Sequence, residues 1–281
     1  MSQTHQPYSV LMSVYCAEKA DHLMLALNSI LNQTVSPDEI FIVEDGPLPA
    51  TLQTIIEDQR RQNPALYTIL ALPENKGLGP ALAAGLPKCR NEVIARMDSD
   101  DYSYPARMEN ELTLMEANDL DMVGTQVTEF VISPDRPIAR TDLPVTDSDI
   151  RKYSHRRNPF RHPSIVYKRS SVLAAGNYSS DYPFFEDWEL FNRLLDNRNR
   201  AANVNQVLVA MRVSKDFYAR RGGRRYMRDM LHFKYDQWRK GYFSLADFCL
   251  TALPHAAVCL IPNTLRSYIY SHVLRKRQDN A

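Results

Sequence analysis

Apolar and polar residues follow two different periods over the first 120 residues of the chain. Four short, β-branched and apolar runs predict buried strands, and after each run apolar residues recur every three or four positions, as on one helix face. The predicted strands are Tyr8 to Tyr15, Glu39 to Val43, Tyr67 to Leu72 and Val93 to Met97. The predicted helices are Ala20 to Leu31, Leu52 to Gln62, Pro80 to Lys88 and Pro105 to Met115. Four strand–helix units in succession predict an α/β fold with a doubly wound, mainly parallel sheet.

The pattern is looser after about residue 120 and predicts a second group of elements. Further strands are expected at Met122 to Val131, Ser164 to Tyr167 and Val204 to Val213, with a helix from Asp187 to Leu195. Terminal helices are expected at Arg225 to Trp238, Leu245 to Ala252 and Asn263 to Leu274. We therefore expect one domain over residues 1–225, divided at about residue 120, and a helical extension over residues 226–281.

The composition is close to the globular average. Hydrophobic residues make up 44% and charged residues 24% of the 281 positions, and only 9 are glycine, which argues against disorder or a fibrous repeat. The four cysteines have no CxxC spacing, and the N-terminus has no basic segment followed by an apolar run. We expect a reduced, cytoplasmic protein without structural zinc.

Basic residues accumulate towards the end of the chain, although its net charge is only +1. They are Arg220, Arg221, Arg224, Arg225, Arg239, Lys240, Arg266, Arg275, Lys276 and Arg277. Attraction to phosphates or to anionic lipid headgroups would explain them, and so would a solvated helix face. No aromatic-basic RNA motif or zinc finger accompanies this charge, so nucleic acid is not an expected partner.

The most apolar late stretch, Phe248 to Ile261, is too short to cross a bilayer, because its 14 residues compare with the roughly 20 that a spanning helix needs. Basic residues at 239–240 and 275–277 flank it. This layout predicts an interfacial helix on the anionic inner face of the cytoplasmic membrane, and hence a peripheral membrane protein. In the alternative, four apolar side chains pack on the preceding domain, namely Phe248, Leu250, Leu253 and Val258.

Polar residues follow the predicted strands at points that would share one edge of the sheet. Tyr15, Asp45 and the run Asp98-Ser99-Asp100-Asp101 each end a parallel strand, which is where doubly wound sheets bind ligands. Two carboxylates in an Asp-x-Asp run suit a hard divalent cation such as Mg2+ or Mn2+, which keeps positions open for phosphate oxygens. An acidic turn or a helix cap is the alternative, and the position after an apolar strand favours the metal.

Six motifs occur in a fixed order along residues 8–225. They are Ser9 to Tyr15, Ser29-Ile30-Leu31-Asn32-Gln33-Thr34, Val43-Glu44-Asp45-Gly46, Asn75-Lys76-Gly77, Arg96-Met97-Asp98-Ser99-Asp100-Asp101 with Pro105 and Arg107, and Phe185-Glu186-Asp187-Trp188. In this order they resemble the family 2 glycosyltransferases with the GT-A fold, particularly the bacterial enzymes that build surface polysaccharides. The resemblance implies that residues 1–120 bind a nucleotide sugar and that residues 121–225 bind the acceptor.

The resemblance also implies a role for each residue at the strand ends. The nucleotide-sugar contacts would be Ser13, Tyr15, Asp45, Lys76, Asp98 and Ser99. Among them, Tyr15 would stack on the base, and Asp45 would accept a hydrogen bond from the imide N–H of uracil. Asp98 would face the ribose and diphosphate. Asp100 would be the direct metal ligand. Asp101 would be a third member of the site or, equally well, a helix cap.

Asp187 resembles the family's general base, which takes the acceptor proton on the face opposite the leaving diphosphate. An acidic first helical turn is the alternative for Glu186 and Asp187. His162 lies where the family often has a histidine near the acceptor, although a lone histidine is more often structural. Arg220 and Arg221, followed by two glycines, would close a loop on phosphate oxygens or form an exposed basic turn.

The resemblance predicts an inverting glycosyltransferase that uses Mn2+ or Mg2+. Its donor would be a UDP-hexose, and its acceptor a saccharide or a polyprenyl-diphosphate-linked saccharide. A nucleotidyltransferase that makes the activated sugar is one alternative, but the segment after the first strand is not a glycine-rich basic loop. A non-catalytic sugar-binding protein is another, yet Asp100 and Asp187 are both present. The segment after Gly77 lacks the arginine of many relatives, so the resemblance does not imply which sugar is transferred.

Overall fold

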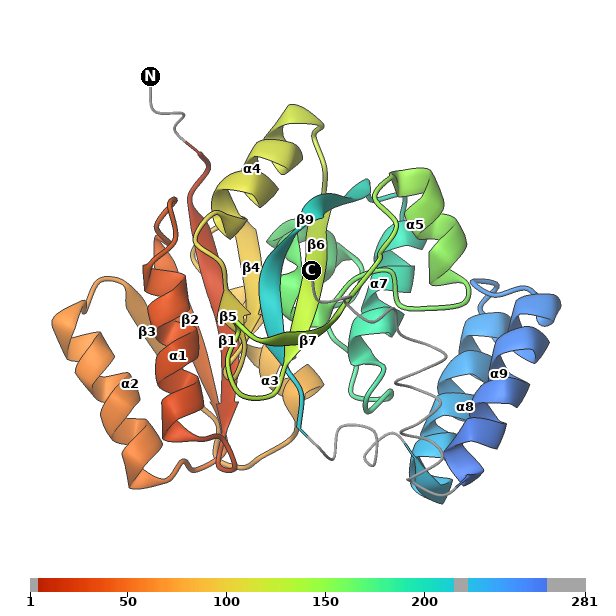
Figure 1. Ribbon diagram of the computed structural model, residues 1–281, viewed down its shortest axis with the longest axis horizontal. Helices are drawn as coiled ribbons and strands as arrows, with labels where there is room; N and C mark the ends of the chain where they lie inside the picture. Colours follow the sequence, from red (N-terminus) through yellow and green to blue (C-terminus); the bar gives the residue numbers. More distant parts are fainter. Residues whose placement is uncertain (1–4, 215–221, 262–281) are drawn as a thin grey trace.

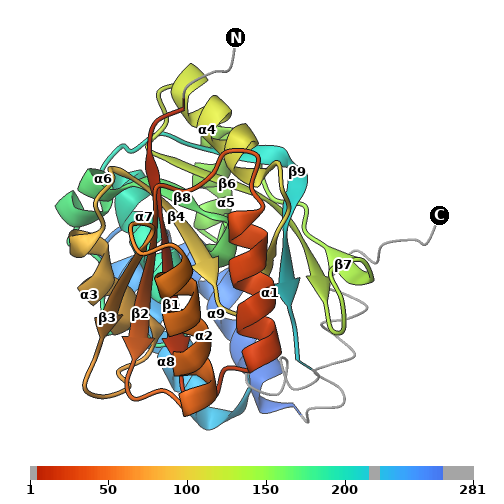
Figure 2. The same cartoon turned by 90° about the vertical axis from the view of Figure 1, so that its left-hand side faces the viewer.

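The structure is a computed structural model that describes residues 5–214 and 222–261 (Figure 1). The predicted helix Asn263 to Leu274 and the paired arginines Arg220 and Arg221 lie outside the described residues. Within these, one nine-stranded sheet runs through the molecule, and helices cover both of its faces (Figures 1 and 2).

The first half of the sheet has the parallel arrangement that the sequence predicts. Its strands are β1 (Tyr8–Tyr15), β2 (Glu39–Asp45), β3 (Tyr67–Ala71) and β4 (Val93–Asp98), in the order β3-β2-β1-β4. The helices are α1 (Ala20–Leu31), α2 (Ala50–Gln62), α3 (Leu78–Gly85) and α4 (Arg107–Ala117). A 3-10 turn, η1 (Leu86–Lys88), replaces the predicted end of the third helix. The four predicted strand–helix units are therefore confirmed.

The second half of the sheet is mixed. β8 (Val166–Lys168) runs antiparallel to β4, and β6 (Met122–Phe130) runs antiparallel to β8. β9 (Ala201–Arg212) is parallel to β6 and pairs with β5 (Tyr102–Ser103), while β7 (Pro137–Arg140) pairs with β6. A 3-10 turn, η2 (His162–Ser164), precedes β8 where the sequence predicted the start of a strand.

Four short elements were not predicted from the sequence. They are β5, β7, α5 (Asp147–Ser154) and α6 (Arg169–Ala174). Elements of two to eight residues complete too few periods for a hydrophobic pattern to reveal them. Their positions depend on neighbouring strands that are distant in sequence.

Alternate side chains of the buried strands build two apolar cores, one on each face of the sheet. On one face Val10 and Met12 of β1 pack with α1, α2 and α4. On the other face Leu11 of β1 and Phe41 of β2 pack with α3 and with α7 (Glu186–Asp196). Figure 2 shows α1 and α2 on one side of the parallel strands and α3 on the other. Both faces of these strands are therefore buried, and the carboxyl edge is where Ser13, Asp45 and Asp98 lie.

Two C-terminal helices, α8 (Gly223–Arg239) and α9 (Leu245–Leu260), form the right-hand side of the molecule in Figure 1. A third apolar cluster joins them to the domain. In it, the rings of Phe185 and Trp188 lie 5.0 and 5.1 Å from the ring of Phe233 on α8. The second of these helices was predicted to end at Ala252. This prediction is wrong, because α9 continues through Pro254 to Leu260. Pro254 lies on the exposed side, where water can satisfy the carbonyl group that lacks a helical donor. None of the described helices is both long and apolar enough to span a bilayer.

Candidate active site

The register of β1 with its two neighbours assembles the predicted nucleotide site. Ser13 on β1 lies opposite Asp98 on β4, and Tyr15 lies opposite Asp45 on β2. These residues therefore meet at one edge of the sheet, as the sequence predicted. The ring of Tyr15 is exposed at this edge, whereas Asp45 is buried. Their individual contacts with a base and a ribose stay predictions.

Asp45 organises the turn that presents Lys76. One oxygen of its carboxylate accepts the backbone N–H of Lys76 at 2.8 Å, and the other accepts that of Gly77 at 3.0 Å. Asn75 donates from its side chain to the carbonyl oxygen of Asp45 at 3.2 Å. Gly77 has a φ of 91°, in the left-handed region that favours glycine. These contacts explain the motif at 75–77 and leave the side chain of Lys76 exposed beside Glu74.

Three carboxylates gather at the end of β4. One oxygen from each of Asp98, Asp100 and Asp101 lies within 4.8 Å of the others. Burial, with repulsion from Asp98 and Glu18, raises the pKa of Asp100 to about 7. Burial, with repulsion from Asp100, raises the pKa of Asp101 well above its ordinary value. The cluster is an unfavourable concentration of negative charge that a cation would relieve.

The acidic cluster fits a divalent metal ion. Its carboxylates are the hard oxygen ligands that Mg2+ and Mn2+ prefer. The Oδ2 atom of Asp101 is buried and has no hydrogen-bond partner within the described part of the chain, so it is available as a ligand. Its Oδ1 atom accepts the backbone N–H of Arg212 at 2.6 Å. The helix-cap interpretation of Asp101 is wrong, because Ala106 is the N-cap of α4.

Two arginines contact the acidic cluster directly. Arg96 of β4 is 1% exposed, and its Nη2 atom pairs with the carboxylate of Asp98. Arg212, the last residue of β9, donates from Nε to the carbonyl oxygen of Asp100 at 3.0 Å. The guanidinium of Arg212 also lies 4.6 Å from the ring centroid of Phe130. Arg212 thus ties the acidic loop to the second half of the sheet.

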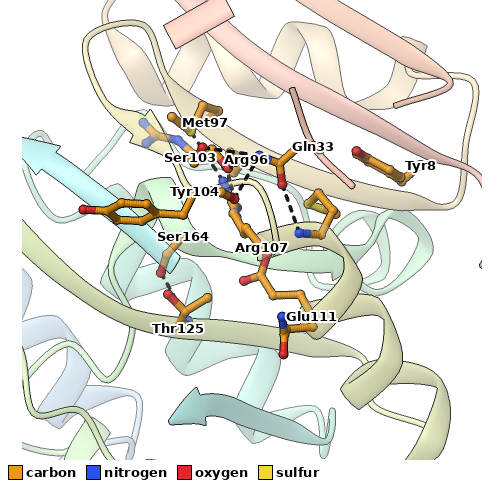
Figure 3. A network of polar contacts seen from close by, with 12 residues as sticks. Tyr8, Gln33, Arg96, Met97, Ser103, Tyr104, Arg107, Glu111, Thr125 and Ser164 are labelled. Atoms are coloured by element: carbon orange, nitrogen blue, oxygen red, sulfur yellow. Dashed lines mark hydrogen bonds and ion pairs between the residues drawn. The ribbon is translucent and has the colours of Figure 1, made fainter. Parts of the chain in front are cut away.

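Buried amide and hydroxyl groups of α1 and the segment after it fix the chain beyond the acidic cluster (Figure 3). Gln33 donates to the carbonyl oxygens of Ser103 and Tyr104 at 3.3 and 3.0 Å. Its Oε1 atom accepts the backbone N–H of Met108 at 3.1 Å. Ser29 accepts the backbone N–H of Ser103 at 3.0 Å. The motif at 29–34 therefore positions the acidic loop and needs no contact with substrate to explain it.

A buried ion pair supports β4 from below the acidic cluster. Arg107 donates to Glu111 at 2.8 Å and to the carbonyl oxygen of Arg96 at 3.0 Å (Figure 3). Burial raises the pKa of Glu111 to about 7, although Arg107 opposes the rise. Breaking such a buried pair by removing one partner would leave an uncompensated polar group. Arg107 is therefore a structural member of the motif that begins at Arg96.

Ser99 connects the acidic loop to the segment that follows β1. Its hydroxyl donates to a carboxylate oxygen of Glu18, and Ser99 itself is buried. Glu18 also lies 3.4 Å from Nδ1 of His22, and its side chain is only 7% exposed. Glu18 therefore adds a fourth carboxylate beside the acidic cluster. Direct contact of Ser99 with a nucleotide sugar stays a prediction.

Asp187 lies in the first turn of α7 and is held by two donors. Its Oδ1 atom accepts the backbone N–H of Trp188 at 2.7 Å, and its Oδ2 atom accepts from the side chain of Asn158 at 2.7 Å. Burial raises the pKa of Asp187, while these hydrogen bonds and the charge of Arg96 oppose the rise. The two donated hydrogen bonds favour the ionised carboxylate, which is the form that can accept a proton.

Glu186 brings the start of α7 next to the start of α3. A Cβ atom on Gly79 would lie 3.3 Å from Cβ of Glu186, which is a tight contact, so glycine allows this approach without a shift of the neighbouring chain. Burial and repulsion from Asp187 raise the pKa of Glu186 to about 7, and Asp98 adds a smaller contribution. The acidic cluster, the turn of Lys76 and the predicted base therefore face the same region.

His162 lies under the site in η2. Its Nε2 atom is 2.8 Å from the hydroxyl of Tyr178, and its ring meets the ring of Phe191 edge-on. Burial, with help from Arg96, lowers the pKa of His162 well below its ordinary value, so the ring is neutral. These contacts favour the structural interpretation of His162 over contact with an acceptor.

Sequence reasoning gave no site role to Glu18, Asn158 or Arg212. Each contacts the site only because segments distant in sequence come together, so the sequence around each residue does not indicate a role in the site. Arg96 belonged to a recognised motif, but its side chain was given no function. A charged residue inside the apolar strand of residues 93–97 is itself a signal, because a buried charge needs a partner.

A mixed α/β sheet with a nucleotide-type edge, an acidic cluster and a helix-borne carboxylate defines a GT-A glycosyltransferase. The sequence profile described as "Glycosyl transferase family 2" matches residues 9–175. The chain is also 37% identical over 279 residues to a UDP-Gal:alpha-D-GlcNAc-diphosphoundecaprenol beta-1,3-galactosyltransferase of Escherichia coli, covering 98% of this chain and 99% of that protein. The chain therefore belongs to the family 2 glycosyltransferases, and it is of the bacterial surface-polysaccharide type.

Another relative and one of the similar solved structures are also glycosyltransferases. The amylovoran biosynthesis glycosyltransferase AmsE of Erwinia amylovora is 35% identical over 222 residues, covering 79% of this chain and 82% of that protein. The mannosyltransferase PcManGT of Pyrobaculum calidifontis, solved with GDP-Man and Mn2+, gives a TM-score of 0.66 at 17% identity, with 98% of this chain and 82% of that chain covered.

Residues 1–349 of S. aureus TarS, solved with UDP-GlcNAc, give a TM-score of 0.64 at 16% identity, with 95% of this chain and 73% of that chain covered. The chain spans 44% of a longer TarS structure. At these identities the solved structures confirm the fold alone. The activity as a glycosyltransferase follows from family membership, which also rules against the nucleotidyltransferase alternative.

Asp100→Asn is expected to stabilise the metal-free chain and to abolish its response to Mn2+. The folded-state pKa of Asp100, about 7, lies above its ordinary value of 3.8. The folded state therefore holds a proton that the unfolded chain has released, and stability from this group is lost as pH rises from about 4 to about 7. In EDTA, the thermal midpoint of the parent should fall more between pH 5 and pH 8 than that of the variant. Mn2+ should restore only the parent.

Asp58→Asn is the matched control, because its carboxylate is half-exposed on α2. This variant should follow the parent in both EDTA and Mn2+. An Asp100→Asn chain that still gains stability from Mn2+ would place the ion elsewhere.

Proposed function

We propose that the chain is an inverting, metal-dependent hexosyltransferase. It transfers a hexose from a UDP-sugar to a saccharide carried on a polyprenyl diphosphate, in the synthesis of a bacterial surface polysaccharide such as O-antigen, capsule or exopolysaccharide. The observation that carries this proposal is the placement of the acidic cluster of β4 and the carboxylate of Asp187 around one region. The acidic cluster suits a metal ion bound to a diphosphate, and the carboxylate of Asp187 suits the hydroxyl of an acceptor.

The strand ends support a uridine nucleotide. Tyr15 offers an exposed ring for a base, and opposite it lies the carboxylate of Asp45, which also accepts the backbone N–H groups of Lys76 and Gly77. Lys76, whose side chain is exposed on the adjacent turn, is a cation for the diphosphate. UDP-galactose and a GlcNAc-diphosphate lipid are the first pair to test, since they are named for the Escherichia coli relative.

The reaction requires one proton acceptor and one leaving group. The acceptor oxygen forms a bond to the anomeric carbon while the bond from that carbon to UDP breaks, and UDP leaves with the bonding electron pair. Asp187 takes the proton of the attacking hydroxyl. Asp100, with Asp98 and Asp101, would hold the Mg2+ or Mn2+ ion, which when bound neutralises negative charge on the diphosphate.

The exposed side of α9 supports attachment to the cytoplasmic face of an anionic membrane. Leu250 and Leu253 are 63% and 67% exposed, so the alternative that they pack on the domain is wrong. Phe248 packs on the neighbouring helix α8 instead, because its ring stacks on Trp238 with the ring centroids 5.8 Å apart, and Val258 is partly buried. The exposed residues of α9 are all apolar or small, namely Leu245, Ala246, Cys249, Leu250, Leu253, Pro254, Ala257 and Leu260. A stripe this apolar on an outer helix is typical of an interfacial surface.

Exposed basic side chains lie on the neighbouring helix and at its end. They are Arg224, Arg225, Arg228, Arg239 and Lys240. Basic side chains near an apolar stripe add attraction to anionic headgroups. A peripheral position would bring the site to a lipid-linked acceptor. The basic residues beyond position 261 lie outside the described residues.

Asp187→Asn is expected to reduce transfer by roughly 10²–10⁴-fold and to leave UDP affinity unchanged. Asparagine keeps the shape of the side chain but cannot take the proton of the acceptor hydroxyl. Steady-state transfer and calorimetric titration with UDP measure the two effects separately. Asp196→Asn, at the exposed far end of α7, is the control and should behave as the parent. Loss of UDP affinity in Asp187→Asn would make the residue part of the donor site.

The product is expected to have the inverted anomeric configuration, so an α-linked UDP-hexose gives a β-linkage. A single displacement inverts the carbon, and Asp187 serves it as the one base. The proton coupling constant at the new anomeric centre of the isolated product measures the configuration. An α-linked product from an α-linked donor would require a different mechanism.

Leu250→Glu with Leu253→Glu is expected to abolish binding to anionic liposomes while transfer to a soluble acceptor continues. The two carboxylates would place charge in the apolar stripe that we propose enters the interface. Flotation with vesicles of phosphatidylglycerol and phosphatidylethanolamine at low salt measures binding. Leu173→Glu is the control, because Leu173 is a partly exposed leucine on α6. Parent chain that fails to float would contradict membrane attachment.

A further inference from the structure

Phe184 is an exposed aromatic residue immediately before the helix that carries Asp187. Its side chain is 56% exposed, whereas its neighbour Phe185 is buried and is the N-cap of α7. Among the described residues, the other aromatic side chains exposed to a similar degree are Tyr15 and Tyr235. Since burial of a phenylalanine ring is favourable, its exposure beside the predicted base calls for an explanation.

The backbone of Phe184 is strained. Its φ of 69° lies in the left-handed region, which bulky residues other than glycine rarely adopt. The other described non-glycine residues with positive φ are Asp119, Asn177 and Arg198. Strained residues of this kind persist where the surrounding structure holds them, and they concentrate at binding and catalytic sites.

Two buried aromatic residues hold this conformation. The backbone N–H of Phe185 donates to the carbonyl oxygen of Tyr182 at 3.0 Å, which closes a turn around Phe184. The ring of Phe185 stacks on Phe233 at 5.0 Å, and the hydroxyl of Tyr182 donates to Asp236 at 2.7 Å. Both ends of the turn are therefore anchored to α8, and the ring between them is directed outward.

The exposed ring of Phe184 has a defined partner. Its centroid lies 5.6 Å from that of Tyr226 on α8, and the two rings are tilted by 56°. Tyr226 is buried and also packs on Phe185 at 5.5 Å. The ring is therefore supported on one side, which makes it a preorganised surface for a ligand.

The residues on either side of the turn that contains Phe184 approach the start of α3. A Cβ atom on Gly79 would lie 3.2 Å from the carbonyl oxygen of Ser179 and 3.3 Å from Cβ of Glu186. The segment before α7 thus packs against the start of α3, next to the turn of Lys76. Phe184 precedes Asp187 by three residues, so a ligand on its ring would lie close to the start of α7.

We propose that Phe184 is the platform on which the acceptor sugar binds. This inference rests on the proposed function, in which the acceptor is a saccharide. The apolar C–H face of a pyranose would pack on the ring, and hydroxyl groups at its edge would reach the carboxylates of Glu186 and Asp187. The exposed carboxylate of Asp181, three residues before Phe184, could accept a further hydrogen bond from the sugar. An apolar ring within three residues of three carboxylates, those of Asp181, Glu186 and Asp187, matches a sugar, which has both kinds of surface, better than a polyprenyl chain.

Phe184→Ala is expected to raise the KM for a GlcNAc-diphosphate with a short alkyl chain by about tenfold, the factor expected for loss of one ring contact. The KM for the UDP-sugar and the affinity for UDP should not change. Phe184→Tyr should behave as the parent. Phe184→Leu should lose affinity as Phe184→Ala does, because leucine keeps apolar area but has no ring. If leucine restores the parent KM, the residue contacts a lipid chain and the proposal is overturned.

Phe184→Gly separates binding from folding. Glycine adopts positive φ without strain, so this variant should keep or raise the thermal midpoint of the parent while its acceptor KM rises. Arg198→Gly relieves a φ of 63° on the loop after α7 and is the matched control. It should leave the acceptor KM unchanged. A Phe184→Gly chain with the parent KM would overturn the proposal.

A binding measurement that needs no transfer distinguishes failure of this inference from failure of the proposed function. Saturation-transfer NMR of methyl glycosides with the UDP-bound chain reports contact between sugar protons and the protein. Saturation should be present for the parent and for Phe184→Tyr and absent for Phe184→Ala. A parent that transfers sugar but shows the same saturation as Phe184→Ala would overturn the platform alone. A parent that binds glycosides through Phe184 but transfers no hexose would overturn the proposed function alone.

Discussion

The structure depends on keeping several carboxylates together at one buried edge of a sheet. Asp98, Asp100 and Asp101 lie at the end of β4, Glu18 lies beside them, and Glu186 and Asp187 begin α7 nearby. Burial disfavours the ionised form of these carboxylates, and repulsion between them adds to this effect, so the pKa of both Asp100 and Glu186 is raised to about 7.

Arg96 is the buried cation between these two groups. It pairs with Asp98 on one side, and its charge opposes the rise in the pKa of Asp187 on the other. Two of its nitrogen atoms, Nε and Nη1, have no hydrogen-bond partner within the described ranges. A fully buried guanidinium in this state is costly, and its electrostatic contact with both acidic groups is what offsets the cost.

Much of the fold could be predicted because its first half depends on local patterns. The strand Tyr8–Tyr15 and the helix Ala20–Leu31 have the bounds that their apolar period predicts. In the mixed half, the predicted strands and helix correspond to β6, β8, β9 and α7. The short β5 could not be predicted, because it has two residues and pairs with β9, which lies about a hundred residues further along the chain.

The same distinction applies to the candidate site. The acidic run was recognisable because it directly follows an apolar strand, at the edge where doubly wound sheets bind ligands. The roles of its neighbours were not recognisable. Gln33 and Arg107 lay in motifs that could have bound substrate, yet they support the acidic loop from within the core. Asn158 reaches Asp187 across 29 positions, which no pattern in a single sequence reveals.

The hydrogen bond from the backbone of Arg212 to Asp101 has a consequence for how the chain becomes an enzyme. It joins residues that are 111 positions apart, and it closes the acidic cluster only when β9 has paired with β6. Contacts of such long sequence separation form late, because chain entropy opposes them until intervening segments are in place. A nascent or partly folded chain therefore has the acidic residues but not their final arrangement. The geometry that suits a divalent ion exists only in molecules that have completed folding.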